Sequence, residues 1–160
     1  MIKLLKPSIK YKTQICTFIE SWEENDFNDH PLFQTMLTFN QYLKQIDTLE
    51  KNRINPMLYY FVLEQNELIG FLELRLAQNE FNHYYAGHLG YGVHPSKRNQ
   101  GYGSLILKKG IQELKKSKVQ PIYLTCDTTH LISKKMFKKI NAHYIEDYQV
   151  ENEQKSIYKI

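Results

Sequence analysis

The chain has 160 residues, 42% of them hydrophobic and 13% aromatic, which is enough to build the core of one domain. The net charge is +4, and with only seven glycines and five prolines the composition excludes a collagen-like or linker-like chain. No apolar run approaches the roughly 18 residues of a membrane span, and the start is too short for a signal peptide. We therefore expect one soluble, cytoplasmic domain over residues 1–160 that does not bind a membrane.

The pattern of apolar and turn residues predicts the following elements in chain order. A strand at Ile2–Leu5 precedes a helix from Ser8 to about Trp22, a polar turn at Asn25–Asp29 and a helix from Pro31 to about Lys51. Two strands, Met57–Leu63 and Leu68–Leu76, follow and are joined by a turn at Gln65–Asn66–Glu67. In the second strand leucines alternate with Phe71, Glu73 and Arg75, which places these three on the opposite face.

The second half begins with a loop over Ala77–Tyr84 and a strand over Ala86–Val93. Then come an amphipathic helix from Tyr102 to about Lys118, a strand at Gln120–Cys126, a short helix at His130–Ile140 and a closing hairpin of His143–Val150 and Ser156–Ile160. The order is β-α-α-β-β-β-α-β-α-β-β. It predicts the α/β class, with a single mixed sheet flanked by helices.

Charge is distributed unevenly along this order. Residues 94–139 hold eleven Lys or Arg against Glu113 and Asp127, whereas residues 20–50 hold seven acids against Lys44. The basic part is suited to a phosphorylated partner and the acidic part to a cation, although solvated helix faces explain both equally well.

Cysteine and histidine usage argues against several other kinds of site. Cys16 and Cys126 alone cannot form a disulfide framework or a structural zinc site. The six histidines show no metal-binding spacing, so we predict no metal. We interpret Cys126 as a small buried residue rather than a nucleophile.

Five of the seven glycines fall between Gly87 and Gly103, around the change from strand to helix at Val93–Ser104. Glycine lets backbone N–H groups approach a ligand closely, and a helix N-terminus directs its free N–H groups to the same place. With Lys97 and Arg98 beside it, this segment predicts a pyrophosphate-binding loop. It is neither a P-loop, because no Gly-Lys-Ser/Thr follows, nor a dinucleotide fingerprint, because Ile106 replaces the third glycine.

The same segment resembles the signature of the GNAT superfamily of acyl-CoA-dependent N-acetyltransferases. The matching residues are Val93-His94-Pro95 and Arg98-Asn99-Gln100-Gly101-Tyr102-Gly103, and the element order is similar over nearly the whole chain. The segments Gly87-His88-Leu89-Gly90-Tyr91 and Leu124-Thr125-Cys126-Asp127 resemble a bacterial subgroup of largely unassigned acetyltransferases. The resemblance implies a GNAT-like, mostly antiparallel central sheet with flanking helices.

The resemblance also implies acetyl-CoA as the acyl donor and assigns roles along the chain. Backbone N–H groups from Gln100 to Ser104 would bind the CoA pyrophosphate, the lysine-rich face could meet the 3′-phosphate, and Val93 would pair with the pantetheine arm. A bulge at Tyr91-Gly92 would open the sheet for the cofactor, and its N–H would polarise the thioester carbonyl. The expected cofactor-binding residues are Gly92, Val93, Arg98, Asn99, Gln100, Gly101, Tyr102, Gly103, Ser104, His130 and Ser133.

Two departures from the family pattern concern proton transfer. The positions that often carry Asn, Ala or Ser, and Tyr hold His130, Ser133 and Phe137 here, and Phe137 cannot protonate the leaving thiolate. For the general base the candidates are Glu73 and His88. A surface pair of Glu73 with Arg75 and a packed structural role for His88 remain open beside these catalytic roles.

We therefore interpret the chain as an N-acyltransferase in which a primary amine attacks acetyl-CoA directly, in a ternary complex. The acids over Glu20–Glu50 favour a cationic acceptor entering there. The alternatives are a non-catalytic CoA-binding sensor, to which Phe137 lends weight, and a nucleic-acid-binding module. The latter is disfavoured because aromatic residues do not interleave with the basic ones. A homodimer is left open.

Overall fold

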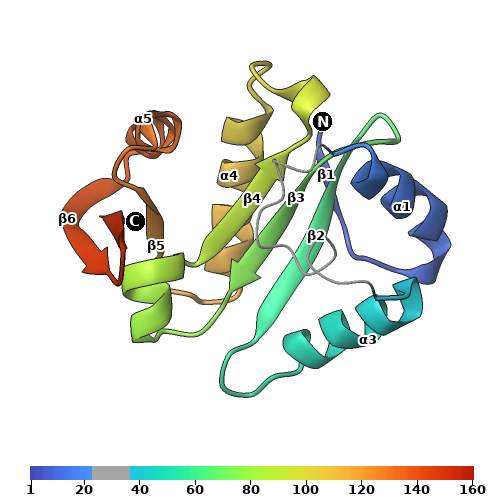
Figure 1. Cartoon of the computed structure of the whole chain (residues 1–160), viewed down its shortest axis with the longest axis horizontal. Coiled ribbons are helices and arrows are strands. Elements are labelled where there is room, and N and C mark those ends of the chain that lie inside the picture. The colour runs from blue at the N-terminus through green and yellow to red at the C-terminus, as the bar shows by residue number, and fades with distance from the viewer. Residues whose placement is uncertain (23–36) are drawn as a thin grey trace. The chain divides into compact units, whose positions relative to one another are not determined.

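The computed structural model describes residues 1–22 and 37–160 (Figure 1). The predicted turn at Asn25–Asp29 and the start of the predicted helix at Pro31 lie outside these residues. The chain forms two compact units: Met1–Glu73 with Tyr91–Ile106, and Leu74–Gly90 with Leu107–Ile160. In the described ranges no helix combines the length and apolar character that crossing a membrane requires.

The first unit is built on a four-stranded sheet in the order β1-β2-β3-β4 (Figure 1). The strands are β1 (Lys3–Leu5), β2 (Met57–Glu64), β3 (Glu67–Arg75) and β4 (Leu89–Val93). The β2–β3 turn consists of Gln65 and Asn66, with φ of 46° and 68°. Two left-handed residues match the twist of a tight hairpin, so the predicted hairpin is confirmed.

Helices α1 (Lys12–Glu20) and α3 (Phe39–Glu50) carry the core of the first unit. A short 3-10 turn, η1 (Ile9–Tyr11), precedes α1, so the predicted helix begins as 3-10 and Ser8 makes no side-chain cap. Thr38 forms a capping box with Gln41 at the start of α3. The buried cluster joins residues of both helices to β2 and β3: Ile15, Phe18, Trp22, Phe39, Tyr42, Ile46, Tyr59, Phe61, Leu68 and Phe71.

Strand β3 is buried on both faces, unlike an ordinary half-exposed strand. The Phe71 side meets Trp22, with ring centroids 5.6 Å apart. On the Gly70 side, a Cβ would lie 2.9 Å from Ile106, at the start of α4 (Tyr102–Lys116). Glu73 therefore lies in a buried strand and is 5% exposed, rather than on a solvated surface.

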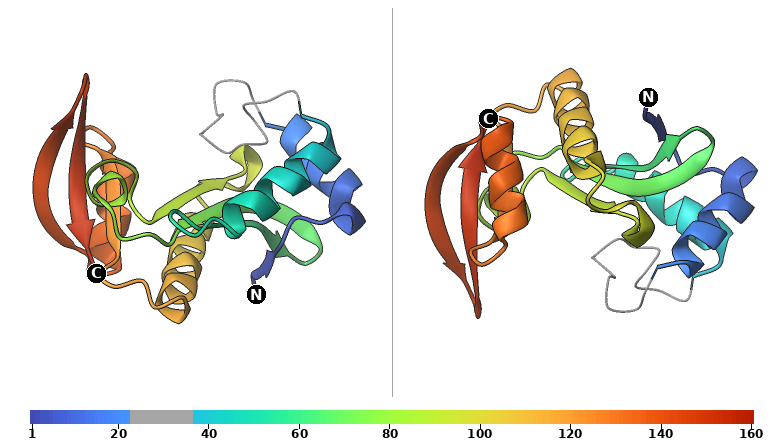
Figure 2. Two further views of the ribbon diagram at one scale, coloured as in Figure 1. Left: turned by 90° about the horizontal axis from the view of Figure 1, so that it is seen from below. Right: turned by 90° about the horizontal axis from the view of Figure 1, so that it is seen from above.

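The second unit contains a three-stranded antiparallel sheet in the order β5-β7-β6 and one short helix packed on it (Figure 2). The elements are β5 (Tyr123–Asp127), β7 (Glu153–Lys159), β6 (His143–Val150) and α5 (Leu131–Lys139). The ring of Phe137 on α5 packs against the ring of Tyr158 on β7, with centroids 5.1 Å apart, and this contact fixes the helix to one face of the sheet. Strand β6 forms the edge of the sheet and is exposed along almost its whole length.

The segment before β4 differs from its predicted loop and long strand. Phe81–Ala86 forms a π-helix, η3, and β4 begins only at Leu89. Asn79 accounts for the difference, because its side chain accepts from the N–H of Asn82 at 2.9 Å and its carbonyl from the N–H of His83 at 3.0 Å. Gly87, with φ of 69°, then ends this helix.

Close packing around Gly92 gives a testable constraint on the first unit. A Cβ at Gly92 would lie 2.5 Å from the Phe71 ring and 2.9 Å from Trp22. We expect Gly92→Ala to lower the free energy of unfolding by about 1–3 kcal/mol, measured by chemical denaturation. Because the clash is with the Phe71 ring, the double variant Gly92→Ala/Phe71→Leu should be more stable than the sum of the single effects predicts. Strict additivity would contradict this account.

Candidate functional site

The loop between β4 and α4 leads into a helix start with open space beside its backbone. Asn99 and Gly101 both have left-handed backbone conformations, with φ of 62° and 86°. The first hydrogen bond at the helix start runs from the N–H of Leu105 to the carbonyl of Gly101, at 3.4 Å. The N–H groups of Tyr102, Gly103 and Ser104 precede that bond and are therefore left without a helical acceptor. A Cβ at Gly101 would meet no atom within 4 Å, so a ligand has room beside this backbone.

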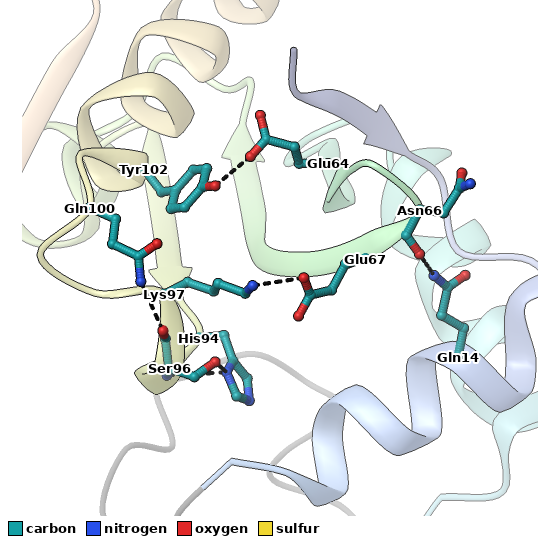
Figure 3. Close-up of polar contacts among 9 residues, drawn as sticks. All are labelled: Gln14, Glu64, Asn66, Glu67, His94, Ser96, Lys97, Gln100 and Tyr102. Carbon is teal, nitrogen blue, oxygen red and sulfur yellow. Dashed lines mark hydrogen bonds and ion pairs between the residues drawn. The ribbon is translucent and has the colours of Figure 1, made fainter.

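The β2–β3 hairpin holds both ends of this loop (Figure 3). Lys97 pairs with Glu67 at 2.7 Å, and Tyr102 donates a hydrogen bond to the carboxylate of Glu64. Within the loop, Gln100 Nε2 donates to the carbonyl of Ser96 at 3.0 Å. The bond from Tyr102 lowers the pKa of Glu64, and the bond to Glu67 raises the pKa of Lys97. The ammonium of Lys97 is thus engaged by a carboxylate, and the backbone is left as the main anion-binding group.

Arg98 turns back toward the strand that precedes the loop. Its Nε donates to the carbonyl of Val93 at 3.2 Å, and its guanidinium carbon lies 5.9 Å from the centre of the Trp22 ring. Arg98 therefore has a structural role at the end of β4. Its predicted contact with the pyrophosphate, and those of Asn99 and Gln100, stay predictions.

His94, directly after β4, links the loop to the end of α1. Its Nδ1 accepts from the N–H of Ser96 at 3.3 Å, which places the proton of the neutral ring on Nε2. Nε2 then donates to Ser21 Oγ at 2.8 Å, and Ser21 Oγ donates to the carbonyl of Phe18 at 2.7 Å. This chain of bonds orients the first residue of the loop. Sequence reasoning named His94 only as part of the motif.

The hydrogen bonds at the two ends of the β3–β4 pair share one register. The N–H of His94 donates to Ile69 and the N–H of Arg75 donates to His88, both at 2.9 Å. Both strands advance by six residues between these bonds, so neither strand has a net insertion relative to the other. The carbonyl oxygen of Gly92 would lie 2.3 Å from a Cβ at Gly70, so this carbonyl is turned out of the plane of the sheet. The expected bulge at Tyr91-Gly92 stays a prediction. Strands β4 and β5 nevertheless belong to different sheets.

On α5, His130 is the N-cap and Phe137 is buried. The Nδ1 atom of His130 accepts from the N–H of Ser133 at 3.2 Å, which leaves the Nε2–H of the neutral ring as a donor. That geometry suits the predicted role of His130 as a hydrogen-bond donor to the cofactor, which stays a prediction together with the role of Ser133. Phe137 is 4% exposed and carries no proton to give.

His88 is completely buried, and one of its two ring nitrogens, Nδ1, has a hydrogen-bond partner. Its Nδ1 accepts from the backbone N–H of Tyr123 at 2.9 Å, so that lone pair is not available to take a proton from an amine. Burial lowers the pKa of His88, and the hydrogen bond from the backbone of Tyr123 opposes this shift. The geometry favours the packed structural role over the catalytic one.

Cys126 is half-buried at the end of β5, and burial raises the pKa of its thiol to about 11. A thiol with a raised pKa is a poor nucleophile at neutral pH, because the thiolate is the reactive form. This agrees with direct transfer rather than transfer through an acylated cysteine.

An open α/β sheet with a strand that leads through a glycine-containing loop into a helix fits the class of acyl-CoA-dependent transferases. The model of the acetyltransferase (GNAT) family matches residues 14–142. The chain belongs to this family, and its fold and enzyme class are those that the sequence predicted. No curated protein matches the chain in sequence.

Solved structures share the fold at low sequence identity. The microcin C7 self-immunity acetyltransferase MccE, solved with acetyl-CoA and AMP, has a TM-score of 0.71 and 16% identity, over 99% of this chain and 91% of its own. RimL, a ribosomal L7/L12 α-N-protein acetyltransferase solved with CoA, has a TM-score of 0.72 and 15% identity, over 99% and 93%. YncA of Salmonella typhimurium, a putative acetyltransferase solved with acetyl-CoA, has a TM-score of 0.65 and 10% identity, over 100% and 92%.

Bulk at Gly103 tests whether the loop binds a ligand. Gly103→Val places a branched side chain in the first turn of α4, beside the free N–H groups, and we expect acetyl-CoA affinity to fall at least about tenfold, or roughly 1.4 kcal/mol. The matched control is Leu105→Val, which introduces the same β-branched side chain in the same turn at an exposed position. Calorimetric titration measures both. Unchanged binding by Gly103→Val would make the loop a structural turn.

His88 predicts how stability depends on pH. The unfolded chain binds this proton near the reference pKa of about 6.5, and the folded chain binds it only at lower pH. The contribution of the neutral, buried His88 to the free energy of unfolding is therefore fully present above about pH 6.5 and is lost as the pH falls through that value. We expect His88→Gln to lower stability by about 1–3 kcal/mol at pH 8 and to flatten the decline between pH 8 and 5.5.

Denaturation curves at several pH values measure this effect. His143→Gln, which removes an exposed imidazole from β6, is the matched control and should keep the wild-type pH dependence. A decline in His88→Gln as steep as in the wild type would show that His88 titrates normally.

Proposed function

We propose that the chain transfers an acetyl group from acetyl-CoA to a primary amine by direct attack within a ternary complex. The observation that carries this proposal is the set of N–H groups at the start of α4, held beside open space by the left-handed residues Asn99 and Gly101. A diphosphate fits such a backbone, because several N–H donors and the positive end of the helix dipole act on the same anion. Acetyl-CoA, when bound there, supplies the thioester.

The remaining contacts follow the family pattern. Val93 lies at the end of β4, where its backbone would extend along the pantetheine arm, and Gly92 lies beside it without a side chain. His130 has an Nε2–H available as a donor at the start of α5. With Phe137 unable to act as an acid, the CoA sulfur would leave as the thiolate, which a thiol of reference pKa about 8.5 permits.

Glu73 is the candidate base. It is buried in β3 and 5% exposed. A carboxylate can take the ammonium proton directly or through one bound water. His88, the other candidate, uses its Nδ1 for the backbone of Tyr123. We therefore assign the base role to Glu73 and a structural role to His88.

Glu73→Gln tests that assignment. We expect turnover to fall about 10²-fold at unchanged acetyl-CoA affinity, because the amide keeps the shape but cannot accept the proton. Glu113→Gln, which removes a carboxylate that pairs with Lys116 on α4, is the control and should leave turnover unchanged. Wild-type turnover in Glu73→Gln with a large loss in His88→Gln would reverse the assignment.

The charge pattern supports a cationic acceptor only in part. Among the described acids of residues 20–50, Asp47 pairs with Lys51 and Glu50 with Lys6, so these charges are already compensated. Glu20 is exposed, and the other four acids lie outside the described residues. The support for a cationic amine therefore rests mainly on the sequence of that segment.

A CoA-binding sensor is the second candidate, and Phe137 at the usual acid position favours it. Release of free CoA from acetyl-CoA, measured with a panel of small amines, peptide N-termini and lysine peptides, separates the two. Amine-dependent CoA release supports the enzyme. Tight acetyl-CoA binding without release with every amine would support the sensor.

A further inference from the structure

A pocket of about 360 Å³ lies in the second unit between α5 and the edge strand β6. Its lining includes Leu131, Lys134, Lys135 and Lys138 from the helix, and Tyr144 and Tyr158 from the sheet. Its volume falls in the range of roughly 300–1,000 Å³ typical of small-molecule sites. We refer to it as the α5–β6 pocket.

The α5–β6 pocket uses a different side of α5 from the acyl-CoA site. The residues assigned to the cofactor by the family pattern are His130 and Ser133, and Phe137 is buried against Tyr158. Lys134 directly follows Ser133, and Lys138 directly follows Phe137. One residue along an α-helix corresponds to a rotation of about 100° around the helix axis, so the two lysines project from another side of α5. None of the residues expected to bind acetyl-CoA lines this pocket.

The lysines of the pocket have no acidic partner in the part of the chain that the structure describes. Elsewhere in the same unit, Lys155 pairs with both Asp127 and Glu153, and Lys116 pairs with Glu113. Lys134 and Lys138 are one helical turn apart, a spacing at which like charges destabilise a helix. Lys138 in the last turn is favoured by the helix dipole, but Lys134 and Lys135 are further from the end. A bound anion would compensate these charges.

The aromatic wall of the pocket suits a flat ring. Tyr144 and Tyr158 are opposite each other on β6 and β7, and their rings meet edge to face with centroids 5.5 Å apart. Tyr158 is almost buried, whereas Tyr144 is 55% exposed and Leu131 65% exposed. An exposed tyrosine ring beside an exposed leucine offers an apolar surface on which a planar group can stack.

We propose that the α5–β6 pocket binds a small phosphorylated molecule with a planar ring, of the class and size of a nucleoside monophosphate. A phosphate monoester carries nearly two negative charges at neutral pH, so it matches more than one lysine, whereas a carboxylate carries one. The ring would stack on Tyr144, and the phosphate would lie among Lys134, Lys135 and Lys138. This site is independent of the acyl-transfer chemistry.

Calorimetric titration of the full chain, with and without saturating acetyl-CoA, tests the site with phenyl phosphate and UMP as probes. Both should bind saturably, and inorganic phosphate, which lacks the ring, should bind at least about tenfold more weakly. The double variant Lys134→Gln/Lys138→Gln should lose at least about tenfold in affinity for both probes, and Tyr144→Leu should lose the preference over inorganic phosphate.

Lys139→Gln is the matched control, because Lys139 is an exposed lysine in the same last turn as Lys138 but does not line the pocket. It should bind both probes as the wild type does. All variants should keep wild-type acetyl-CoA affinity, so a chain that transfers no acetyl group would still report on this site.

Three results would overturn the proposal. The first is the absence of saturable binding by either probe. The second is displacement of the probes by acetyl-CoA, which itself carries a phosphorylated adenosine, because the pocket would then belong to the acyl-donor site. The third is an equal loss of affinity in Lys139→Gln, which would indicate unspecific attraction to the lysines of α5.

Discussion

The loop between β4 and α4, where we propose that the diphosphate binds, depends on one constraint, the left-handed backbone at Asn99 and Gly101 just before α4 begins. Without that conformation the chain would enter the helix directly, and the N–H groups of its first turn would not be directed at one place. Glycine adopts this geometry without strain and asparagine at small strain, which explains both residues. The open space beside Gly101 follows from the same conformation, because no side chain occupies it.

Side chains around the loop hold its two ends in place. Glu64 and Glu67 flank the β2–β3 turn and bind Tyr102 and Lys97, while Arg98 returns to the carbonyl of Val93 (Figure 3). The cations that sequence reasoning placed beside a phosphate are therefore largely used for positioning. A backbone site of this kind binds a diphosphate by geometry and depends less on ionic strength than a cluster of free lysines would.

Local chemistry made much of this predictable from the sequence. The Gln65–Asn66 turn, the start of α4 at Tyr102 and the order of strands and helices follow from turn residues and apolar spacing within a few residues. The π-helix at Phe81–Ala86 was not predictable, because it depends on bonds that Asn79 makes to residues of an otherwise unremarkable polar stretch. Glu64 and Glu67 carry no motif, and their role appears only when the hairpin brings them to the loop.

His88 and Glu73 show the same limit at the chemical step. Alternation along a strand predicted which face of the sheet each of these side chains is on. It could not show that the backbone N–H of Tyr123, 35 residues away, donates to Nδ1 of His88, or that β3 is buried on both faces. Because Nδ1 of His88 accepts from a backbone N–H and Phe137 has no proton to donate, few groups are left for proton transfer. The demand on the proposed base, Glu73, then depends on the acceptor itself. An α-amine, with a reference pKa of about 8, is partly neutral at physiological pH, whereas a lysine amine near 10.4 is almost wholly protonated and needs the base far more.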